Sequence, residues 1–166
     1  LKFNFFNNNE LKLINVGRCT DQKNQILILK AVKYLKKKFP IKLLIAGRGQ
    51  QFSKLNSFIK KNNLNKVVKL LNFLSNPYKY MKRADVVILS SNYEGLPNVL
   101  LEAQCLKKII LSTKCPTGPK EILLNGKAGI FFKMNNYKDL AKKIYEISLN
   151  KNKFKNKIMS GYNGLN

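Results

Sequence analysis

Short apolar runs alternate along this chain with longer segments that mix apolar and polar residues. Six of the runs are four to six residues long and rich in Val, Ile, Leu and Phe, which is typical of buried strands. The predicted strands are Leu11–Val16, Ile41–Ala46, Val67–Leu71, Val86–Leu89, Ile109–Ser112 and Gly129–Phe132. Strands that alternate with helices predict an α/β fold, here a doubly wound parallel six-stranded sheet with helices on both faces.

The segments between the runs carry apolar residues at helical spacing. The clearest stripe follows Asn24 and consists of Leu27, Ile28, Ala31, Val32 and Leu35. Further helices are predicted over Phe52–Lys61, from Pro77, from Pro97 and over Asp139–Leu149. If the strands follow the common order 3-2-1-4-5-6, the first and fourth strands are neighbours whose connections leave to opposite faces, and ligands bind in the crevice between them.

The two ends of the chain lack a clear period. Positions 1–10 are predicted to be the remnant of an interdomain linker, and positions 150–166 to be a Lys/Asn-rich tail that is poorly ordered or cut short. The domain itself is predicted to span positions 11–149. A chain of 166 residues with 45% hydrophobic content is long enough to bury one ordinary core.

The fourth predicted strand leads through the turn Tyr-Glu-Gly-Leu-Pro into a helix whose first turn is marked by Pro97. Gly95 allows backbone to approach backbone closely in this turn. The start of a helix also presents unpaired N–H groups at the positive end of its dipole, here those of Leu96, Asn98 and Val99. The turn is therefore predicted to bind an anion.

Two carboxylates bracket this predicted anion site. Glu94 lies in the turn, and Glu102 follows Asn98 by one helical turn and shares its face. A carboxylate repels a phosphate but accepts hydrogen bonds from sugar hydroxyls, so a phosphate flanked by sugars fits both features. The pair therefore favours a nucleotide sugar; the alternative is that both glutamates are solvated surface residues.

The first two strands end in glycine-containing turns, and Gly17 is expected to permit a turn that a larger residue would not take easily. Gly17 and Arg18 follow the first strand, and Lys23 is predicted in the first turn of the next helix, where its charge opposes the helix dipole and favours an anionic partner. Gly47 and Gly49 follow the second strand. The third glycine of a dinucleotide fingerprint is missing, so a tight strand-to-helix turn is the better interpretation and a dinucleotide-dependent oxidoreductase is disfavoured.

Seven residues separate the two glutamates within Glu-Gly-Leu-Pro-Asn-Val-Leu-Leu-Glu-Ala, which resembles the signature of the retaining nucleotide-sugar glycosyltransferases of family 4. The resemblance covers about positions 11–149. It implies the GT-B fold of two facing Rossmann-like domains, of which this chain resembles the C-terminal, donor-binding half. It also implies a missing N-terminal domain that binds the acceptor, a glycan or lipid-linked molecule of bacterial polysaccharide or lipopolysaccharide-type synthesis.

The resemblance implies a role for each candidate residue. Arg18 and Lys23 would grip the diphosphate of a donor, expected to be UDP-linked, while Glu102 would hold the ribose hydroxyls and Glu94 the transferred sugar. Gly17, Gly47 and the backbone from Gly95 to Val99 would lie against the nucleotide. Retention of configuration is expected, as is catalysis without a metal or other cofactor, because the chain has no His and no Asp-x-Asp.

Three other segments bear on the resemblance. Family members often have a glycine where this chain has Asn72, beside a loop that would contact the base. A helix-ending glycine followed by proline is also usual, whereas this chain continues from Leu106 with Lys-Lys-Ile. The segment Cys115–Ile122 resembles a string common in bacterial members, and its turn is a candidate donor contact; Glu121 is otherwise a favourable first-turn acid.

The chain is strongly basic, with 32 Lys and Arg against 8 Asp and Glu and a net charge of +24. This charge leaves a nucleic-acid-binding α/β module without transferase activity as the main alternative, although the bases are spread over all helices rather than gathered in one stripe. A basic surface would also favour peripheral contact with anionic lipid. An odd number of cysteines without metal-ligand spacing predicts a reducing, cytoplasmic setting, and no apolar run is long enough to span a bilayer.

Overall fold

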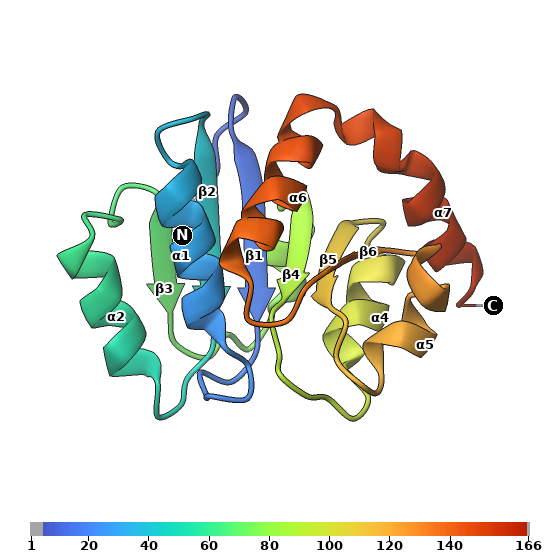
Figure 1. The fold of residues 1–166 in the computed structure, drawn as a ribbon, viewed down its shortest axis with the longest axis horizontal. Helices are drawn as coiled ribbons and strands as arrows, with labels where there is room; N and C mark the ends of the chain where they lie inside the picture. Colours follow the sequence, from blue (N-terminus) through green and yellow to red (C-terminus); the bar gives the residue numbers. More distant parts are fainter. Residues whose placement is uncertain (1–4, 166) are drawn as a thin grey trace.

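A computed structural model describes residues 5–165 and contains one six-stranded parallel sheet of order β3-β2-β1-β4-β5-β6 (Figure 1). The predicted fold class and strand order are confirmed. The strands are β1 Leu11–Val16, β2 Ile41–Ala46, β3 Val68–Leu71, β4 Val86–Leu89, β5 Ile109–Thr113 and β6 Ile130–Phe132. The α-helices are α1 Gln25–Leu35, α2 Phe52–Lys61, α3 Tyr78–Met81, α4 Asn98–Cys105, α5 Pro119–Ile122, α6 Tyr137–Leu149 and α7 Lys155–Asn163, with 3-10 turns η1 Leu124–Gly126 and η2 Lys151–Phe154.

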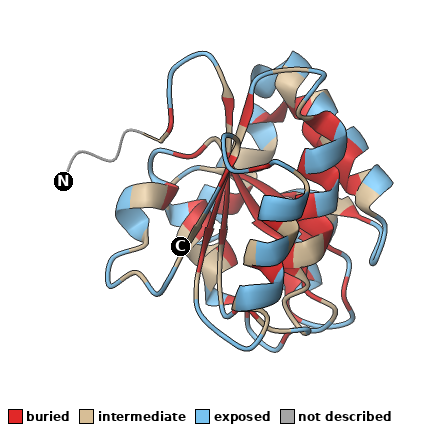
Figure 2. Ribbon diagram, turned by 90° about the vertical axis from the view of Figure 1, so that its left-hand side faces the viewer, coloured by how far each residue is buried: buried red, intermediate tan, exposed pale blue. Residues whose placement is uncertain are grey.

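Helices cover both faces of the sheet. Leu13 of β1 packs with α1, α2 and α6, whereas its neighbour Ile14 packs with α3 and α4, because successive side chains of a strand point to opposite faces. Figure 2 shows the buried strands in red between the helices. Burial on both faces explains why the strands read as nearly continuous apolar runs.

The ladder between β1 and β4 is short. These two strands pair only at Leu13 with Val86 and at Ile14 with Val87, whereas β1 and β2 pair along their whole length. At the next position the side-chain amide of Asn15 donates a hydrogen bond of 2.8 Å to the carbonyl oxygen of Ile88. An amide side chain thus stands between the two strands at the point where their connections leave to opposite faces.

The ends of the chain differ from the prediction. Residues 1–4 of the predicted linker lie outside the described residues, but Phe6 is 6% exposed and packs in the cluster that contains Ile14. At the other end η2 and α7 fold onto the domain, with Phe154 buried and Gly161 packed against Gln104. The expectation of a poorly ordered tail is therefore wrong, whereas the division into linker, domain and tail stays a prediction.

The end of α4 explains the missing helix-ending glycine. Lys107 adopts a φ of 53°, the left-handed conformation that glycine usually supplies where a helix ends in this way. The Lys108 N–H then donates to the carbonyl of Ala103 at 3.0 Å, and the Lys107 N–H to that of Gln104 at 2.9 Å. The Lys107 ammonium lies 4.1 Å from the ring centre of Tyr162, so a contact with α7 accompanies this conformation.

Candidate functional site

The turns after β1 and β2 are joined through backbone contacts at the carboxyl edge of the sheet. The Gly17 N–H donates to the Ala46 carbonyl at 3.0 Å, and the Cys19 N–H donates to the Arg48 carbonyl at 2.9 Å. A Cβ on Gly47 would lie 1.9 Å from the Gly17 carbonyl oxygen. Close packing therefore requires a glycine at position 47. The expectation that Gly17 itself needs the freedom of glycine is wrong, since its φ is not positive and a Cβ there would meet nothing closer than 3.9 Å.

An open cavity of about 470 Å³ lies beside these joined turns. Its lining is mostly apolar and consists of Val16, Gly17, Arg18, Ala46, Gly47, Arg48, Phe73, Leu74 and Pro77. The Arg48 guanidinium lies 5.0 Å from the ring centre of Phe73, and Phe73 is 63% exposed. Arg18 is also exposed, and no described side chain pairs with its guanidinium. The cavity thus offers apolar walls, an aromatic ring and two cationic groups.

Lys23 and Glu94 form an ion pair next to this cavity. The Lys23 ammonium lies 2.5 Å from Oε1 of Glu94, and the two side chains are 18% and 6% exposed. The Ser91 hydroxyl donates to the same oxygen at 2.5 Å, while no described group donates to Oε2. The anionic partner expected for Lys23 is therefore present within the protein. Lys23 precedes α1 rather than lying in its first turn.

The turn after β4 is fastened to the turn after β1. The Asn92 N–H donates to the Gln22 carbonyl at 2.8 Å, and the Ser90 hydroxyl donates to the Lys23 carbonyl at 2.7 Å. A Cβ on Gly17 would lie 3.9 Å from the aliphatic carbons of Lys23. These contacts bring Gly17, Lys23 and Glu94 together where β1 and β4 end, as the sequence predicts.

The start of α4 is open to solvent at Gly95. No heavy atom lies within 4 Å of the position that a Cβ on Gly95 would take, and Leu96 is 68% exposed. The N–H groups of Leu96 and Val99 have no acceptor among the described residues. The Asn98 N–H donates to the Leu96 carbonyl at 3.0 Å, so the expected set of three unpaired N–H groups is reduced to two, and Pro97 is the cap rather than part of the first turn.

Glu102 lies one turn into α4 and accepts a hydrogen bond of 3.1 Å from the Tyr78 hydroxyl. This bond and the negative charge of Glu102 raise the pKa of Tyr78, because both favour the protonated phenol. Tyr78 follows Pro77, which lines the cavity. Glu102 therefore lies on the α3 side of the cavity, whereas Glu94 lies on the α1 side.

Sequence reasoning missed the residues that support the candidate site. Ser91 and Thr117 donate to Glu94, and a Cβ on Gly118 would lie 2.2 Å from the Gly95 carbonyl oxygen. Serine and threonine hydroxyls have no signal of their own in a loop. The sequence shows Gly118, but it does not show that Gly118 packs against the Gly95 carbonyl.

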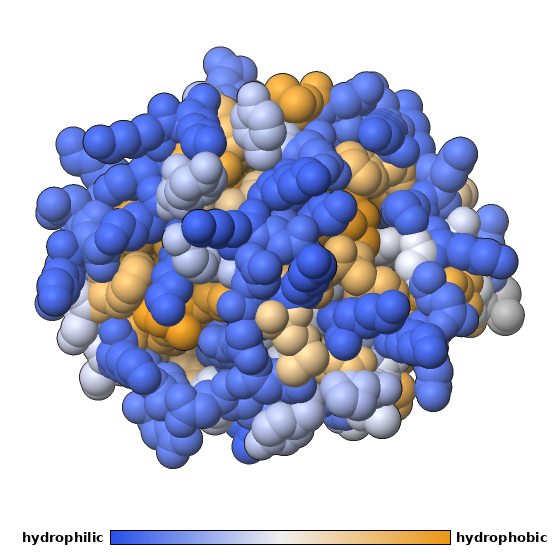
Figure 3. Space-filling view, viewed as in Figure 1, coloured by the Kyte–Doolittle hydropathy of each residue, from blue (hydrophilic) through white to orange (hydrophobic). Residues whose placement is uncertain are grey.

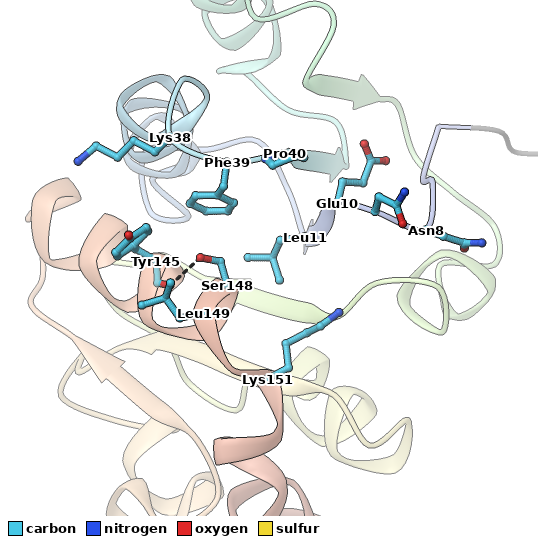
Figure 4. Close-up of a pocket in the computed structure, with 11 residues that line it drawn as sticks. Asn8, Glu10, Leu11, Lys38, Phe39, Pro40, Tyr145, Ser148, Leu149 and Lys151 are labelled. Atoms are coloured by element: carbon cyan, nitrogen blue, oxygen red, sulfur yellow. Dashed lines mark hydrogen bonds between the residues drawn. The ribbon is translucent and has the colours of Figure 1, made fainter.

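A second cavity, of about 340 Å³, lies at the opposite edge of the sheet (Figure 4). It is found between the start of β1, the connection into β2 and the end of α6, where the rings of Phe39 and Tyr145 are 5.9 Å apart. None of the predicted site residues lines it. The amino ends of parallel strands are also not where such sheets bind ligands. The candidate site is therefore the edge at Gly47, Lys23 and Glu94.

Other kinds of site find little support in residues 5–165. No three His, Cys, Asp or Glu side chains of this region lie close enough together to hold a metal ion. No helix in it is both long and apolar enough to cross a bilayer. Burial raises the pKa of the Cys19 and Cys115 thiols, which suits packing rather than reactivity. Figure 3 shows hydrophilic side chains across the whole visible face, with small apolar patches between them.

A parallel sheet of this order, with glycine turns, cations and two glutamates at the carboxyl edge of β1 and β4, defines a Rossmann-like domain. Residues 2–163 match the family described as glycosyl transferases group 1. The chain belongs to this family.

Relatives in the family include proteins from archaea and bacteria. An uncharacterized glycosyltransferase of Methanocaldococcus jannaschii is 43% identical over 111 residues, which are 66% of this chain and 27% of the relative. An N-acetylgalactosamine-N,N'-diacetylbacillosaminyl-diphospho-undecaprenol 4-alpha-N-acetylgalactosaminyltransferase of Campylobacter jejuni is 33% identical over 124 residues, 75% of this chain and 33% of the relative. The matching region thus spans about a third or less of these relatives.

Solved structures share the fold. HepE of Anabaena in complex with UDP has a TM-score of 0.83 at 20% identity over 93% of this chain and 43% of that one. The catalytic domain of cholesterol-alpha-glucosyltransferase from Helicobacter pylori has a TM-score of 0.77 at 24% identity over 93% of this chain and 97% of that one. At such identities the likeness extends to the architecture alone, a Rossmann-like domain of the kind found in GT-B glycosyltransferases.

Proposed function

We propose that this chain is the donor-binding part of a retaining, metal-independent glycosyltransferase that takes a sugar from a UDP-sugar. The observation that carries the proposal is the ion pair of Lys23 and Glu94 beside the open backbone at Gly95. A nucleotide sugar needs cations for its phosphates and hydrogen-bond acceptors for its hydroxyls, and both kinds of group are adjacent here.

The ion pair removes the conflict between a carboxylate and a bound phosphate. An ammonium has three N–H donors, and Lys23 uses one of them on Glu94, so two are available to an anion. The charge of Glu94 is offset by the same lysine. The leaving diphosphate would be stabilised by Lys23, Arg18 and the N–H groups of Leu96 and Val99, which is the electrostatic task of the reaction.

Each remaining part of the donor has a candidate contact. The exposed Phe73 ring and the Arg48 guanidinium offer flat surfaces for a base in the cavity of about 470 Å³. Glu102 would accept hydrogen bonds from the ribose, held by Tyr78 through one of its oxygens. Glu94 would accept a hydroxyl of the transferred sugar through Oε2. HepE, a neighbour in fold, has been crystallised with UDP, which supports uracil as the base.

The rest of the reaction would need groups from elsewhere. The acceptor, a glycan or lipid-linked molecule of a bacterial polysaccharide pathway, would be bound by an N-terminal domain, because the family's curated relatives are longer than the matching region. We also propose a cytoplasmic location with peripheral contact to anionic lipid, driven by the charge of +24. Salt-sensitive sedimentation with phosphatidylglycerol vesicles tests the lipid contact, which is refuted if the protein stays in the supernatant at low salt.

Calorimetric titration of the protein with UDP, NAD and a mixed-sequence DNA duplex separates the candidate functions. We expect binding of UDP and not of NAD. Binding of DNA without any response to UDP would instead favour the nucleic-acid-binding alternative. Phe73→Ala should weaken UDP binding by about tenfold, the effect of about 1–2 kcal/mol of lost stacking. Tyr34→Ala is the control, because Tyr34 is 50% exposed on α1 and does not line this cavity.

A further inference from the structure

Strand β5 and the turn after it hold the turn that carries Glu94 at three backbone carbonyls. The Thr113 hydroxyl donates to the Ser91 carbonyl at 2.6 Å, and the Thr117 hydroxyl donates to the Glu94 carbonyl at 2.5 Å. Gly118 packs directly against the Gly95 carbonyl, where a Cβ would lie 2.2 Å from the oxygen. The turn from Glu94 to Gly95 is therefore fixed from the β5 side.

The carboxylate of Glu94 is held as firmly as its backbone. Ser91 is fully buried, and its hydroxyl donates to Oε1, the oxygen that also accepts from Lys23. Two donors on one oxygen fix the rotation of the carboxylate and leave Oε2 as the acceptor without a described partner. Charge-assisted hydrogen bonds of this kind are short and directional.

We propose that Ser91 and Thr117 are positioning residues that aim Oε2 of Glu94 at a hydroxyl of the sugar in the donor. Ser91 fixes the orientation of the Glu94 carboxylate through Oε1, and Thr117 fixes the position of the Glu94 backbone through its carbonyl. The pair therefore controls how strongly the protein prefers a UDP-sugar to UDP alone. This inference rests on the proposed function, because it needs the nucleotide sugar to occupy this edge of the sheet.

The contacts explain what the turn at positions 115–119 does. From the sequence this turn is a candidate for direct contact with the donor. In the structure the Thr117 hydroxyl is used on Glu94, and Gly118 and Pro119 are buried. The turn acts on the ligand through Glu94. Misplacing a hydrogen-bonding group by a fraction of an ångström weakens a directional contact far more than it weakens the remaining binding.

The experiment compares Thr117→Val, which has the same shape without the hydroxyl, with Thr117→Ser, which keeps the hydroxyl. Dissociation constants are measured by calorimetry for UDP and for UDP-glucose, UDP-N-acetylglucosamine and UDP-N-acetylgalactosamine. For the preferred UDP-sugar, Thr117→Val should lower the ratio of UDP-sugar to UDP affinity about five- to tenfold and leave UDP affinity within about twofold. Thr117→Ser should keep the ratio of the unaltered protein.

Ser91→Ala provides a second, independent measurement with the same expected fall in the ratio. Ser148→Ala is its matched control, because the Ser148 hydroxyl donates to the Tyr145 carbonyl at 2.7 Å at the far edge of the sheet. Glu94→Gln gives the full size of the effect. Thr117 is exposed, so its variants should fold, which circular dichroism checks.

Three results would overturn the inference while the proposed function stands. They are binding of UDP with no preference for any UDP-sugar, an unchanged ratio in both Thr117→Val and Ser91→Ala, and an equal loss of UDP and UDP-sugar affinity in both variants. A failure of the unaltered protein to bind UDP at all is a different result, because it overturns the proposed function itself.

Discussion

Gly95→Ala separates folding from ligand binding at the start of α4. No heavy atom lies within 4 Å of the position of the added methyl group, and Gly95 does not have a positive φ. The folded protein can therefore accept the methyl group without strain. Alanine also loses less backbone entropy on folding than glycine, so the free energy of unfolding should stay the same or rise by about 0.4–1 kcal/mol.

The same methyl group would stand where a phosphate approaches the backbone. Oxygen atoms of a diphosphate that reach the N–H groups of Leu96 and Val99 must pass close to Gly95, the function that glycine has in other phosphate-binding turns. We expect UDP affinity to fall at least tenfold, which corresponds to about 1.4 kcal/mol. Calorimetry measures the affinity, and urea denaturation measures the free energy of unfolding.

Gly118→Ala is the comparison. Its Cβ would lie 2.2 Å from the Gly95 carbonyl oxygen and 2.7 Å from Cδ of Pro97, and its φ is +80°. Contacts this short force the backbone to move, so we expect a loss of about 1–3 kcal/mol of folding free energy. Unchanged UDP affinity in Gly95→Ala would refute the phosphate site at this turn. A Gly95→Ala protein as unstable as Gly118→Ala would refute the description of the turn itself.

Two further predictions concern the helix end and the tyrosine. Lys107→Gly should raise the free energy of unfolding by about 1 kcal/mol in a Tyr162→Leu background, because glycine takes the left-handed conformation without strain and no cation–π contact is lost there. In the unaltered protein the gain should be smaller, because the contact with Tyr162 is lost. Urea denaturation of the unaltered protein, the two single variants and the double variant tests this. The pKa of Tyr78 lies above its usual 10.0, so the stability that its bond to Glu102 contributes is present below pH 10 and is lost as the pH rises through the higher pKa. Glu102→Gln should therefore lower the pKa of Tyr78, which an ultraviolet titration measures. Tyr78→Phe identifies the part of the signal that belongs to Tyr78.

Much of the fold follows from local patterns. The strands are buried on both faces, so Leu11–Val16 and Val86–Leu89 stand out as apolar runs, and one common strand order then brings Gly17 and Glu94 to the same edge. Hydrophobic runs give strand positions within about a residue, because the end of a run coincides with the end of burial. The final helix was missed because its sequence has no apolar stripe. Only Gly161 is buried in it, and a buried glycine gives no hydrophobic signal.

The details of the site depended on contacts between distant positions. Lys23 and Glu94 were each matched to a different part of a ligand, yet the structure pairs them across 71 positions of sequence. Spacing along the chain shows that both reach one edge, but side-chain geometry decides that they touch. The sequence similarly led us to assign the need for glycine to Gly17, whereas the structure assigns it to Gly47. The atom that excludes a side chain at Gly47 is the Gly17 carbonyl oxygen, which belongs to a different turn.

The side chain of Asn15 has a consequence for how the crevice meets its ligand. The Asn15 amide donates to the Ile88 carbonyl where the β1–β4 ladder has ended, so this carbonyl keeps a hydrogen bond without a backbone partner on β1. A ligand that enters the crevice therefore meets no β1–β4 backbone hydrogen bonds that it would have to break. The fold itself ends the ladder at this point, so we expect ligand binding at the crevice to leave the hydrogen bonds of the sheet intact.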